Sequence, residues 1–258
     1  MPELPEVENL VSGLRPRLVG SIIETTHVLC PTSIQEPDPA QFAEQIGGRM
    51  VTGVRRRGKY IICLLDDDWC LLMHLRMTGQ LFLTNNTTPE PRWARMALLL
   101  HDNRTLWFCD MRKFGRLALT RTPGRLLNSL GPEPFDPSLD AARFYARLQS
   151  HRRPIKSLLL AQSFLAGLGN IYTDESLFGA GINPYTPASA LTLDEATSLL
   201  RSIRSVLAQA ITNRGTTIAT YVDANGTPGR NQEQLKVYGR DGEPCSRCQT
   251  TIIRIRLG

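Results

Sequence analysis

The sequence predicts an α+β protein of two domains, in which a β-rich N-terminal half precedes a helical C-terminal half. Residues 21–120 contain apolar runs rich in Ile, Val, Leu and Trp, separated by turn signals, a pattern typical of an antiparallel sandwich or barrel. From about residue 138 the apolar residues recur at helical spacing. The proline- and glycine-rich segment 122–137 between the two halves is therefore predicted to be a linker.

A helix is expected to begin at the N-terminus, before the first strand. Its apolar stripe recurs at steps of three and four residues and consists of Leu4, Val7, Leu10, Val11 and Leu14. Pro5 is tolerated in a first turn, where its missing N–H would have no partner. The acidic residues at this end, Glu3, Glu6 and Glu8, can compensate the helix dipole.

The remaining elements follow from pattern and punctuation. The runs expected to form strands are 21–30, 50–67, 69–83, 94–110 and 115–120, with a short helix inserted within 34–48. A long helix is expected within 191–212, where Thr192 and Glu195 form a capping-box signature. A loop follows over 213–230, and a final strand pair is expected around Cys245 and Cys248. The predicted domains are 1–121, 138–230 and 231–258, with the linker at 122–137.

The composition indicates an anionic partner and a cytoplasmic location. The formal charge is +6 and the pI is about 9.2, which fits either nucleic-acid binding or a solvated basic surface. The cationic residues form short clusters at 55–59, 112–116 and 152–156, as in a groove lined by several elements. No apolar run reaches the roughly 18 residues of a membrane span, and the N-terminal segment lacks the pattern of a signal peptide.

The first residues can supply a nucleophile. Removal of Met1 would leave Pro2 with a free secondary amine, and an α-amino group titrates near about 7.7 to 8.0, so part of it is unprotonated at neutral pH. Glu3 lies next to that amine and could transfer protons to a substrate that the amine attacks. Glu3 could equally serve only as a partner of the helix dipole.

Several polar residues could bind phosphate groups. The segment 167–178 places two glycines and Asn170 at the opening of a helix, which suits either an anion site or a plain turn between helices. Lys156 upstream could add a second contact. Lys59 could clamp a phosphate or protect a sheet edge from aggregation, and His74 taken alone reads as a structural histidine.

Three further residues have two interpretations. Met77, Arg112 and Phe114 are placed at strand ends, where two apolar side chains and an arginine could enter a base stack as wedges. Most Met and Phe residues, however, belong to cores.

Cys245 and Cys248 have the spacing of half a zinc ribbon. A structural zinc site needs four ligands and usually carries a second Cys pair about 15 to 20 residues further on. The other four cysteines are scattered among apolar neighbours and are expected to be reduced packing residues.

Taken together, these segments resemble the formamidopyrimidine-DNA glycosylase family, which includes the endonuclease VIII type. The motifs occur in the family's order over nearly the whole chain: MPELPEVE, RRRGKY, HLRMTG, DMRKFG, GLGNIYTDESLF, GINP and LKVYGRDGEPCSRC. The start ELPE is similar to the branch that acts on oxidised purines. In the oxidised-pyrimidine branch a glycine typically stands in place of Leu4.

The resemblance implies a bifunctional base-excision repair enzyme that acts on duplex DNA. It implies that Pro2 attacks the sugar of a flipped nucleotide, that Glu3 gives acid-base help, and that β,δ-elimination through an iminium then cuts the strand. It also implies a helix-two-turn-helix domain and a β-hairpin zinc finger, and a loop over 216–229 that closes over the extruded base. The matching residues are Lys59 and Asn170 as backbone grips, His74, Lys156 and Tyr238 as lesser phosphate contacts, and Met77, Arg112 and Phe114 as residues that fill the base stack.

The zinc finger departs from the family pattern. Only Cys245 and Cys248 of four expected zinc ligands precede Gly258, and the family's finger arginine is also absent. A natural chain ending at Gly258 would be expected to retain zinc poorly and to bind DNA weakly. A longer chain would be expected to carry a tail that is flexible without DNA.

The leading hypothesis is therefore a monomeric repair glycosylase with one structural zinc. A non-catalytic DNA-binding relative would also explain the basic clusters and the Cys pair. A small-molecule enzyme that uses an N-terminal proline as a base would leave both of those features without a role.

Overall fold

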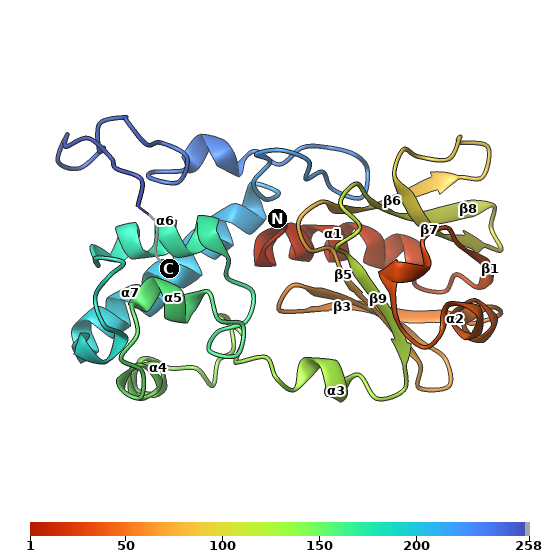
Figure 1. Ribbon diagram of the computed structural model, residues 1–258, viewed down its shortest axis with the longest axis horizontal. Coiled ribbons are helices and arrows are strands. Elements are labelled where there is room, and N and C mark those ends of the chain that lie inside the picture. Colours follow the sequence, from red (N-terminus) through yellow and green to blue (C-terminus); the bar gives the residue numbers. More distant parts are fainter. Residues whose placement is uncertain (256–258) are drawn as a thin grey trace. The chain divides into compact units, whose positions relative to one another are not determined.

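The computed structural model describes residues 1–255, which form two compact units. The first unit comprises Met1–Leu127 together with Arg214–Gly229, and the second comprises Asn128–Asn213 and the chain from Arg230 onward. Figure 1 shows the ribbon of both units, with most of their helices and strands labelled. The predicted domain limits at 121, 137 and 230 remain predictions.

Within residues 1–127, a four-stranded and a five-stranded sheet form a sandwich. Their orders are β1-β7-β8-β6 and β2-β9-β5-β4-β3. Neighbouring strands pair antiparallel, as predicted, except that β2 pairs parallel with β9. The strands are β1 Ile23–Val28, β2 Ile34–Glu36, β3 Val51–Arg57, β4 Tyr60–Leu65, β5 Cys70–His74, β6 Gly79–Asn85, β7 Ala94–Leu100, β8 Arg104–Asp110 and β9 Arg116–Thr120.

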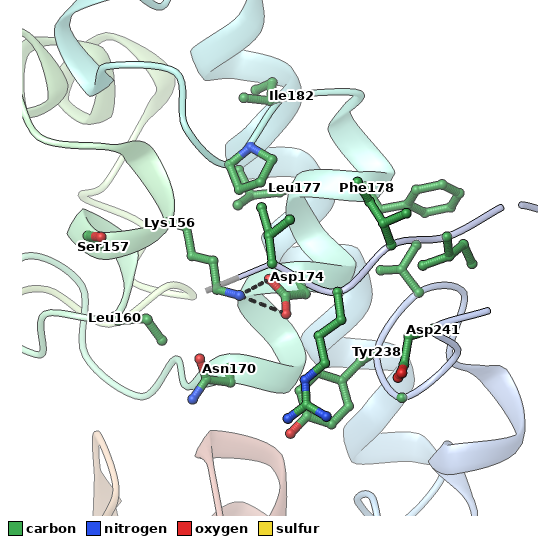
Figure 2. A pocket seen from close by; sticks show the side chains of 17 residues that line it. Lys156, Ser157, Leu160, Asn170, Asp174, Leu177, Phe178, Ile182, Tyr238 and Asp241 are labelled. Carbon is green, nitrogen blue, oxygen red and sulfur yellow. Dashed lines mark hydrogen bonds and ion pairs between the residues drawn. The ribbon is translucent and has the colours of Figure 1, made fainter. Parts of the chain in front are cut away.

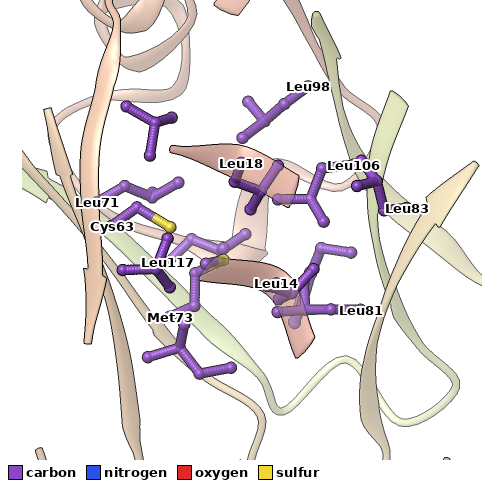
Figure 3. Close-up of a cluster of buried hydrophobic side chains, with 14 of the residues drawn as sticks. Leu14, Leu18, Cys63, Leu71, Met73, Leu81, Leu83, Leu98, Leu106 and Leu117 are labelled. Carbon is purple, nitrogen blue, oxygen red and sulfur yellow. The ribbon is translucent and has the colours of Figure 1, made fainter. Parts of the chain in front are cut away.

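The N-terminal helix α1, Leu4–Leu18, supplies part of the sandwich core. Its buried face joins the inward residues of both sheets in one cluster. Figure 3 shows Leu14 and Leu18 of α1 among side chains such as Leu81 of β6 and Met73 of β5. The apolar stripe read from the sequence is thus the face that the sheets cover, and this packing fixes the start of the chain.

The N-terminus of α1 is capped by a side-chain carboxylate. The side chain of Glu6 accepts a hydrogen bond from the backbone N–H of Glu3 at 2.8 Å, and both residues are buried. Glu8 instead pairs with Arg56 of β3, with Nε 2.8 Å from Oε2. These acidic residues therefore make specific contacts in addition to compensating the helix dipole.

The loop 214–229 packs onto the first unit because its apolar residues enter that unit's core. Tyr221 and Ala224 belong to the same buried cluster as α1. Gly215 and Gly229 approach so closely that a Cβ on Gly229 would lie 2.1 Å from the carbonyl oxygen of Gly215. A side chain at Gly229 would thus push the two ends of the loop apart.

Two strand runs predicted as continuous are each divided by a turn: the first forms the β3–β4 hairpin, and the second passes from β5 in the five-stranded sheet to β6 in the four-stranded sheet. The run 50–67 turns at Gly58, whose φ of +55° suits glycine, and the run 69–83 turns after β5, where Arg76 has a φ of +53°. The prediction missed these turns because neither contains the Pro, Asn or Asp signals of ordinary turns. Lys59 and Met77 therefore lie in turns, not on strands.

The second unit is helical, as the sequence predicts. Its helices are α4 Ala141–Gln149, α5 Ile155–Leu159, α6 Asn170–Ala180 and α7 Leu193–Thr212, and the short helix α3, Gly124–Leu127, precedes it at the end of the first unit. The capping box of Thr192 and Glu195 at the start of α7 is confirmed. α6 and α7 meet at Gly179, where a Cβ would lie 2.2 Å from Oγ of Ser202.

Two smaller expectations need correction. The segment 34–48 contains strand β2 as well as the predicted helix, α2, Pro39–Ile46. The predicted final strand pair is reduced, within residues up to 255, to one antiparallel bridge between Pro244 and Thr251. The residues around it are mostly exposed, so little apolar burial supports a longer ladder.

Replacing Leu14 by Ala should destabilise the first unit by about 2 to 5 kcal/mol, because the methyl groups lost are fully buried between the sheets. Urea unfolding followed by tryptophan fluorescence measures this unit, since Trp69, Trp93 and Trp107 all lie in it. The matched control is Leu29→Ala at a half-exposed position of the same unit, where the change should stay within about 0.5 kcal/mol. Equal effects of the two substitutions would contradict the assignment of Leu14 to the core.

Candidate functional site

The first unit gathers Pro2, Glu3 and Lys59 in a buried environment. Pro2 is buried, Glu3 is 2% exposed and Lys59 is 5% exposed. Burial lowers the pKa of Lys59, the carboxylates of Glu3 and Glu6 oppose that shift, and Arg76 adds to it. The buried amine of Lys59 thus lies close to the carboxylates of Glu3 and Glu6. An amine and carboxylates shielded from solvent in this way are suited to proton transfer.

The β3–β4 turn is what brings Lys59 inward. Gly58 adopts a left-handed conformation that a side chain would strain, and its carbonyl oxygen accepts a hydrogen bond from Arg56 at 3.0 Å. β4 then pairs Tyr60 with His74 across the sheet. The sequence allowed two roles for Lys59, a phosphate clamp or a charge that protects an exposed sheet edge. Because Lys59 is buried, the second role is disfavoured.

His74 lies beside Lys59 and is held as a neutral imidazole. Its ring packs edge-on against Tyr60, with centroids 4.7 Å apart, and Nδ1 accepts the N–H of Arg76 at 3.1 Å. Burial, with Arg76 and Lys59 nearby, lowers the pKa of His74 to about 3. Because Nδ1 is an acceptor, the proton of the neutral ring belongs on Nε2, which can donate to a ligand.

Glu6 links the head of α1 to the loop 214–229. Its Oε2 accepts the N–H of Glu3, and its Oε1 accepts the N–H of Thr216 at 2.7 Å. The Tyr221 hydroxyl donates to the backbone oxygen of Glu6 at 3.3 Å, and burial raises the pKa of that phenol. A side chain on Gly215 would crowd this carboxylate. From the sequence, Glu6 was expected only to compensate the helix dipole. Nothing in the sequence shows that Thr216 lies next to Glu6 in the fold.

Met77, Arg112 and Phe114 form one exposed cluster. Met77 and Phe114 are 44% and 45% exposed, and Arg112 lies between them. One guanidinium nitrogen of Arg112 is 3.3 Å from Sδ of Met77, and its Cζ lies 4.6 Å from the centroid of the Phe114 ring. Met77 and Phe114 are half-exposed and contact Arg112, so they are not core residues. The interpretation of these residues as part of a core is therefore excluded.

Asp110 shapes the turn that carries Arg112 and Phe114. It is buried, and its carboxylate accepts the N–H groups of Arg112 at 3.2 Å and Gly115 at 2.7 Å. The Thr78 hydroxyl also donates to it, which ties this turn to the turn that carries Met77. Sequence reasoning missed Asp110. An Asp that begins a short turn ending in Gly is the signal that could have found it.

The second unit places Asn170, Lys156 and Tyr238 around a cavity of about 940 Å³. Figure 2 shows Lys156 from α5 directed at Asp174 on α6, with Asn170 and Tyr238 further along the wall. Asn170 opens α6, and the N-terminal end of a helix favours anions. Gln162 orders the chain just before it by bonding the N–H of Gly167 and the carbonyl of Leu168, at 2.9 and 2.8 Å.

Glu175 holds Tyr238 in this unit. Its buried carboxylate accepts the backbone N–H groups of Lys236, Val237 and Tyr238, each at 2.9 Å. Three donors on one carboxylate fix the path of this segment against α6. The residue was not singled out in the sequence, because its partners lie about 60 positions away in the chain.

Cys245 and Cys248 fit half of a zinc site. The N–H of Arg247 points at Sγ of Cys245 at 3.4 Å, and hydrogen bonds from Thr250 and then from Cys245 lower the pKa of the exposed Cys248 thiol. Among residues 1–255, however, no group of three or more His, Cys, Asp or Glu side chains could hold a metal ion. The described residues supply two of the four ligands that a structural zinc needs, so they do not complete the site.

Two family models match the chain. The formamidopyrimidine-DNA glycosylase N-terminal domain matches residues 1–117, and the formamidopyrimidine-DNA glycosylase H2TH domain matches residues 130–222. The two matches correspond to the β-rich and the helical parts of the chain.

Curated relatives match over nearly their full length. The formamidopyrimidine-DNA glycosylase of Moorella thermoacetica is 46% identical, with 99% of this chain and 95% of that protein aligned. That of Chloroflexus aurantiacus is 44% identical, with 99% and 92% aligned.

Solved structures agree. A Lactococcus lactis FPG mutant in complex with Fapy-dG-containing DNA has a TM-score of 0.93 at 35% identity, covering 99% of this chain and 95% of that chain. The Lactococcus lactis Fpg with abasic-site DNA has a TM-score of 0.91 at the same identity, covering 99% and 94%.

The fold and these matches define a DNA glycosylase of base-excision repair that also acts as an AP lyase. The chain belongs to the formamidopyrimidine-DNA glycosylase family. The predicted family, α+β fold and enzyme class are thereby confirmed. Among the helices within residues 1–255, none has both the length and the apolar character needed to cross a membrane.

His74 should make stability depend on pH. The unfolded chain binds a proton near about pH 6.5, whereas the folded protein does so only near pH 3. Wild type should therefore lose about 1.4 kcal/mol of unfolding free energy, relative to His74→Gln, for each pH unit below about 6.5. Urea unfolding of both proteins at pH 7 and 5 measures the difference. Equal losses in the two proteins would mean that folded His74 takes up the proton.

Proposed function

We propose that this enzyme removes oxidised purines from duplex DNA and cuts the strand by β,δ-elimination, with Pro2 as the nucleophile. After Met1 is removed, the lone pair of the Pro2 nitrogen forms a bond to the sugar anomeric carbon. The bond from that carbon to the base breaks, and its electron pair leaves with the base, which takes up a proton. Loss of the amine proton and opening of the sugar ring then give an iminium.

The iminium serves as an electron sink for strand cleavage. A base removes a proton from the sugar carbon next to the iminium, and the electron pair moves through the resulting enamine to expel the 3′ phosphate. A second proton loss further along the sugar expels the 5′ phosphate. Glu3 is proposed as the group that moves these protons, since it lies beside Pro2 and is shielded from solvent.

The observation that carries this proposal is the burial of Glu3 and Lys59 beside Pro2. Burying an ammonium and a carboxylate costs folding free energy, and ionisable groups that a protein buries at this cost cluster at functional sites. We propose that Lys59 grips the DNA backbone at the lesion. Its lowered pKa supports this role, because burial has already removed much of its hydration.

Contacts to the DNA backbone are proposed for Asn170, Lys156, Tyr238 and His74. The helix start at Asn170 and the cavity beside it support phosphate binding. Neutral His74 would donate through Nε2. The relatives from Lactococcus lactis bind DNA that contains Fapy-dG or an abasic site, which supports the same substrate class here.

The oxidised-purine branch is proposed from Leu4, which stands where the oxidised-pyrimidine branch typically has glycine. Its side chain is fully buried in this structure. We further propose a cytoplasmic monomer and one structural zinc that includes Cys245 and Cys248 among its ligands. The domain limits 1–121, 122–137, 138–230 and 231–258 are retained as part of this proposal.

Sodium borohydride should trap the enzyme on duplex DNA that carries an oxidised guanine opposite cytosine, because it reduces the iminium to a stable crosslink. Pro2→Gly, or a form with a blocked N-terminus, should lose the crosslink by at least about 100-fold. Lys59→Met is the control for the other amine: crosslinking should be slower but still occur on abasic-site DNA. A crosslink that depends on Lys59 and not on Pro2 would overturn the assignment of the nucleophile.

Replacing Arg112 by Ala should reduce cleavage of oxidised-guanine duplex by about 10-fold or more, because Met77, Arg112 and Phe114 are proposed to fill the space left by the everted base. The loss should be smaller on abasic-site DNA, which has no base to evert. Single-turnover cleavage measures both rates. Arg201→Ala, an exposed arginine of α7, is the matched control. Equal losses on the two substrates would argue against a role in base eversion.

A further inference from the structure

The cavity of the second unit contains an ion pair between Lys156 and Asp174. A site that only binds phosphate would not need the negative charge of Asp174. Nζ of Lys156 lies 2.7 Å from Oδ1 and 2.9 Å from Oδ2 of Asp174. Both carboxylate oxygens thus contact the same ammonium, as the dashed lines in Figure 2 show. The side chains are only 14% and 25% exposed, so solvent screens this contact less than it would a surface pair.

The pair lies where an incoming phosphate would bind. Asp174 stands one helical turn after Asn170 on α6, so the two side chains are on the same face. Lys156, Asn170, Asp174 and Tyr238 all line the cavity. A phosphate that approaches Asn170 therefore meets a carboxylate whose charge cancels that of Lys156.

We propose that Asp174 occupies Lys156 and thereby weakens binding to duplex DNA, whether damaged or undamaged. The inference rests on the proposed role of Lys156 as a phosphate contact. Phosphate contacts carry no sequence information, so each one strengthens binding to every site alike. A carboxylate paired with Lys156 must give up that ion pair when a phosphate binds, so it lowers the affinity for every duplex by the same amount.

Asp174→Asn tests the charge alone, because the amide oxygen still accepts a hydrogen bond from Lys156 while the negative charge is lost. The variant should bind undamaged duplex about 3- to 10-fold more tightly. Its slope of log K against log salt should become steeper by about 0.9, the value for one added phosphate contact. Fluorescence anisotropy at several salt concentrations gives both quantities. The variant should also bind duplex with a tetrahydrofuran abasic analogue more tightly by a similar factor, so the preference between the two duplexes should stay nearly unchanged.

Asp241→Asn is the matched control, since it removes the same charge from another residue that lines the cavity. It should change the affinity and the slope by less than half as much. Asp174→Glu keeps the charge and should behave like wild type, which separates loss of charge from damage to the fold.

The Lys156→Met background tests whether the effect passes through Lys156. In that background Asp174→Asn should no longer tighten binding to undamaged duplex. Persistence of the full effect would overturn the inference, as would weaker binding, or no change, in the single Asp174→Asn variant.

A separate variant tests whether Lys156 contacts phosphate at all. Lys156→Met alone should weaken binding to the tetrahydrofuran duplex several-fold. If it does not, the role of Lys156 fails and this inference fails with it. If it does while Asp174→Asn has no effect, only the inference fails.

Discussion

The buried carboxylate of Glu6 is the contact on which the first unit's site depends. One oxygen holds the backbone of Glu3 at the head of α1, and the other holds Thr216 in a loop more than 200 positions later. Its charge also opposes the loss of the Lys59 proton. Because α1 packs against both sheets, the residues at its N-terminus are held in a fixed position. A buried charge left without these donors would cost several kcal/mol, so the head of the helix and the loop stabilise one another.

Carboxylates perform the same task at three further points. Asp110 orders the turn below Arg112 and Phe114, Glu175 fixes the segment that carries Tyr238, and Asp174 restrains Lys156. Each couples a residue proposed to bind DNA to a rigid element of its own unit. A protein with a net charge of +6 can use its acidic residues in this way, since the overall attraction to a polyanion remains. The acidic side chains thus decide how the basic and apolar ones are presented.

The periodicity of the sequence was enough for the main elements. Apolar spacing located α1 and α7, because one face of each is buried and the other is not. It failed at the turns around Lys59 and Met77, where Gly58 and Arg76 take left-handed conformations without an Asn, Asp or Pro signal. It also could not show that Tyr221 and Ala224 belong to the first unit's core. A loop rich in polar residues gives no period from which its packing partner can be read.

By itself, the sequence determined the two kinds of architecture, the order of the motifs and the chemical groups available, since these depend on local composition and spacing. It was enough to predict four candidate site residues: Pro2, Glu3, Lys59 and Asn170. Only the tertiary structure decided which of these groups are shielded, and which carboxylate each one meets. The roles of Glu6, Glu175 and Asp174 rest on partners that are distant in the chain or on adjacent elements, and such contacts arise from packing, not from neighbouring residues.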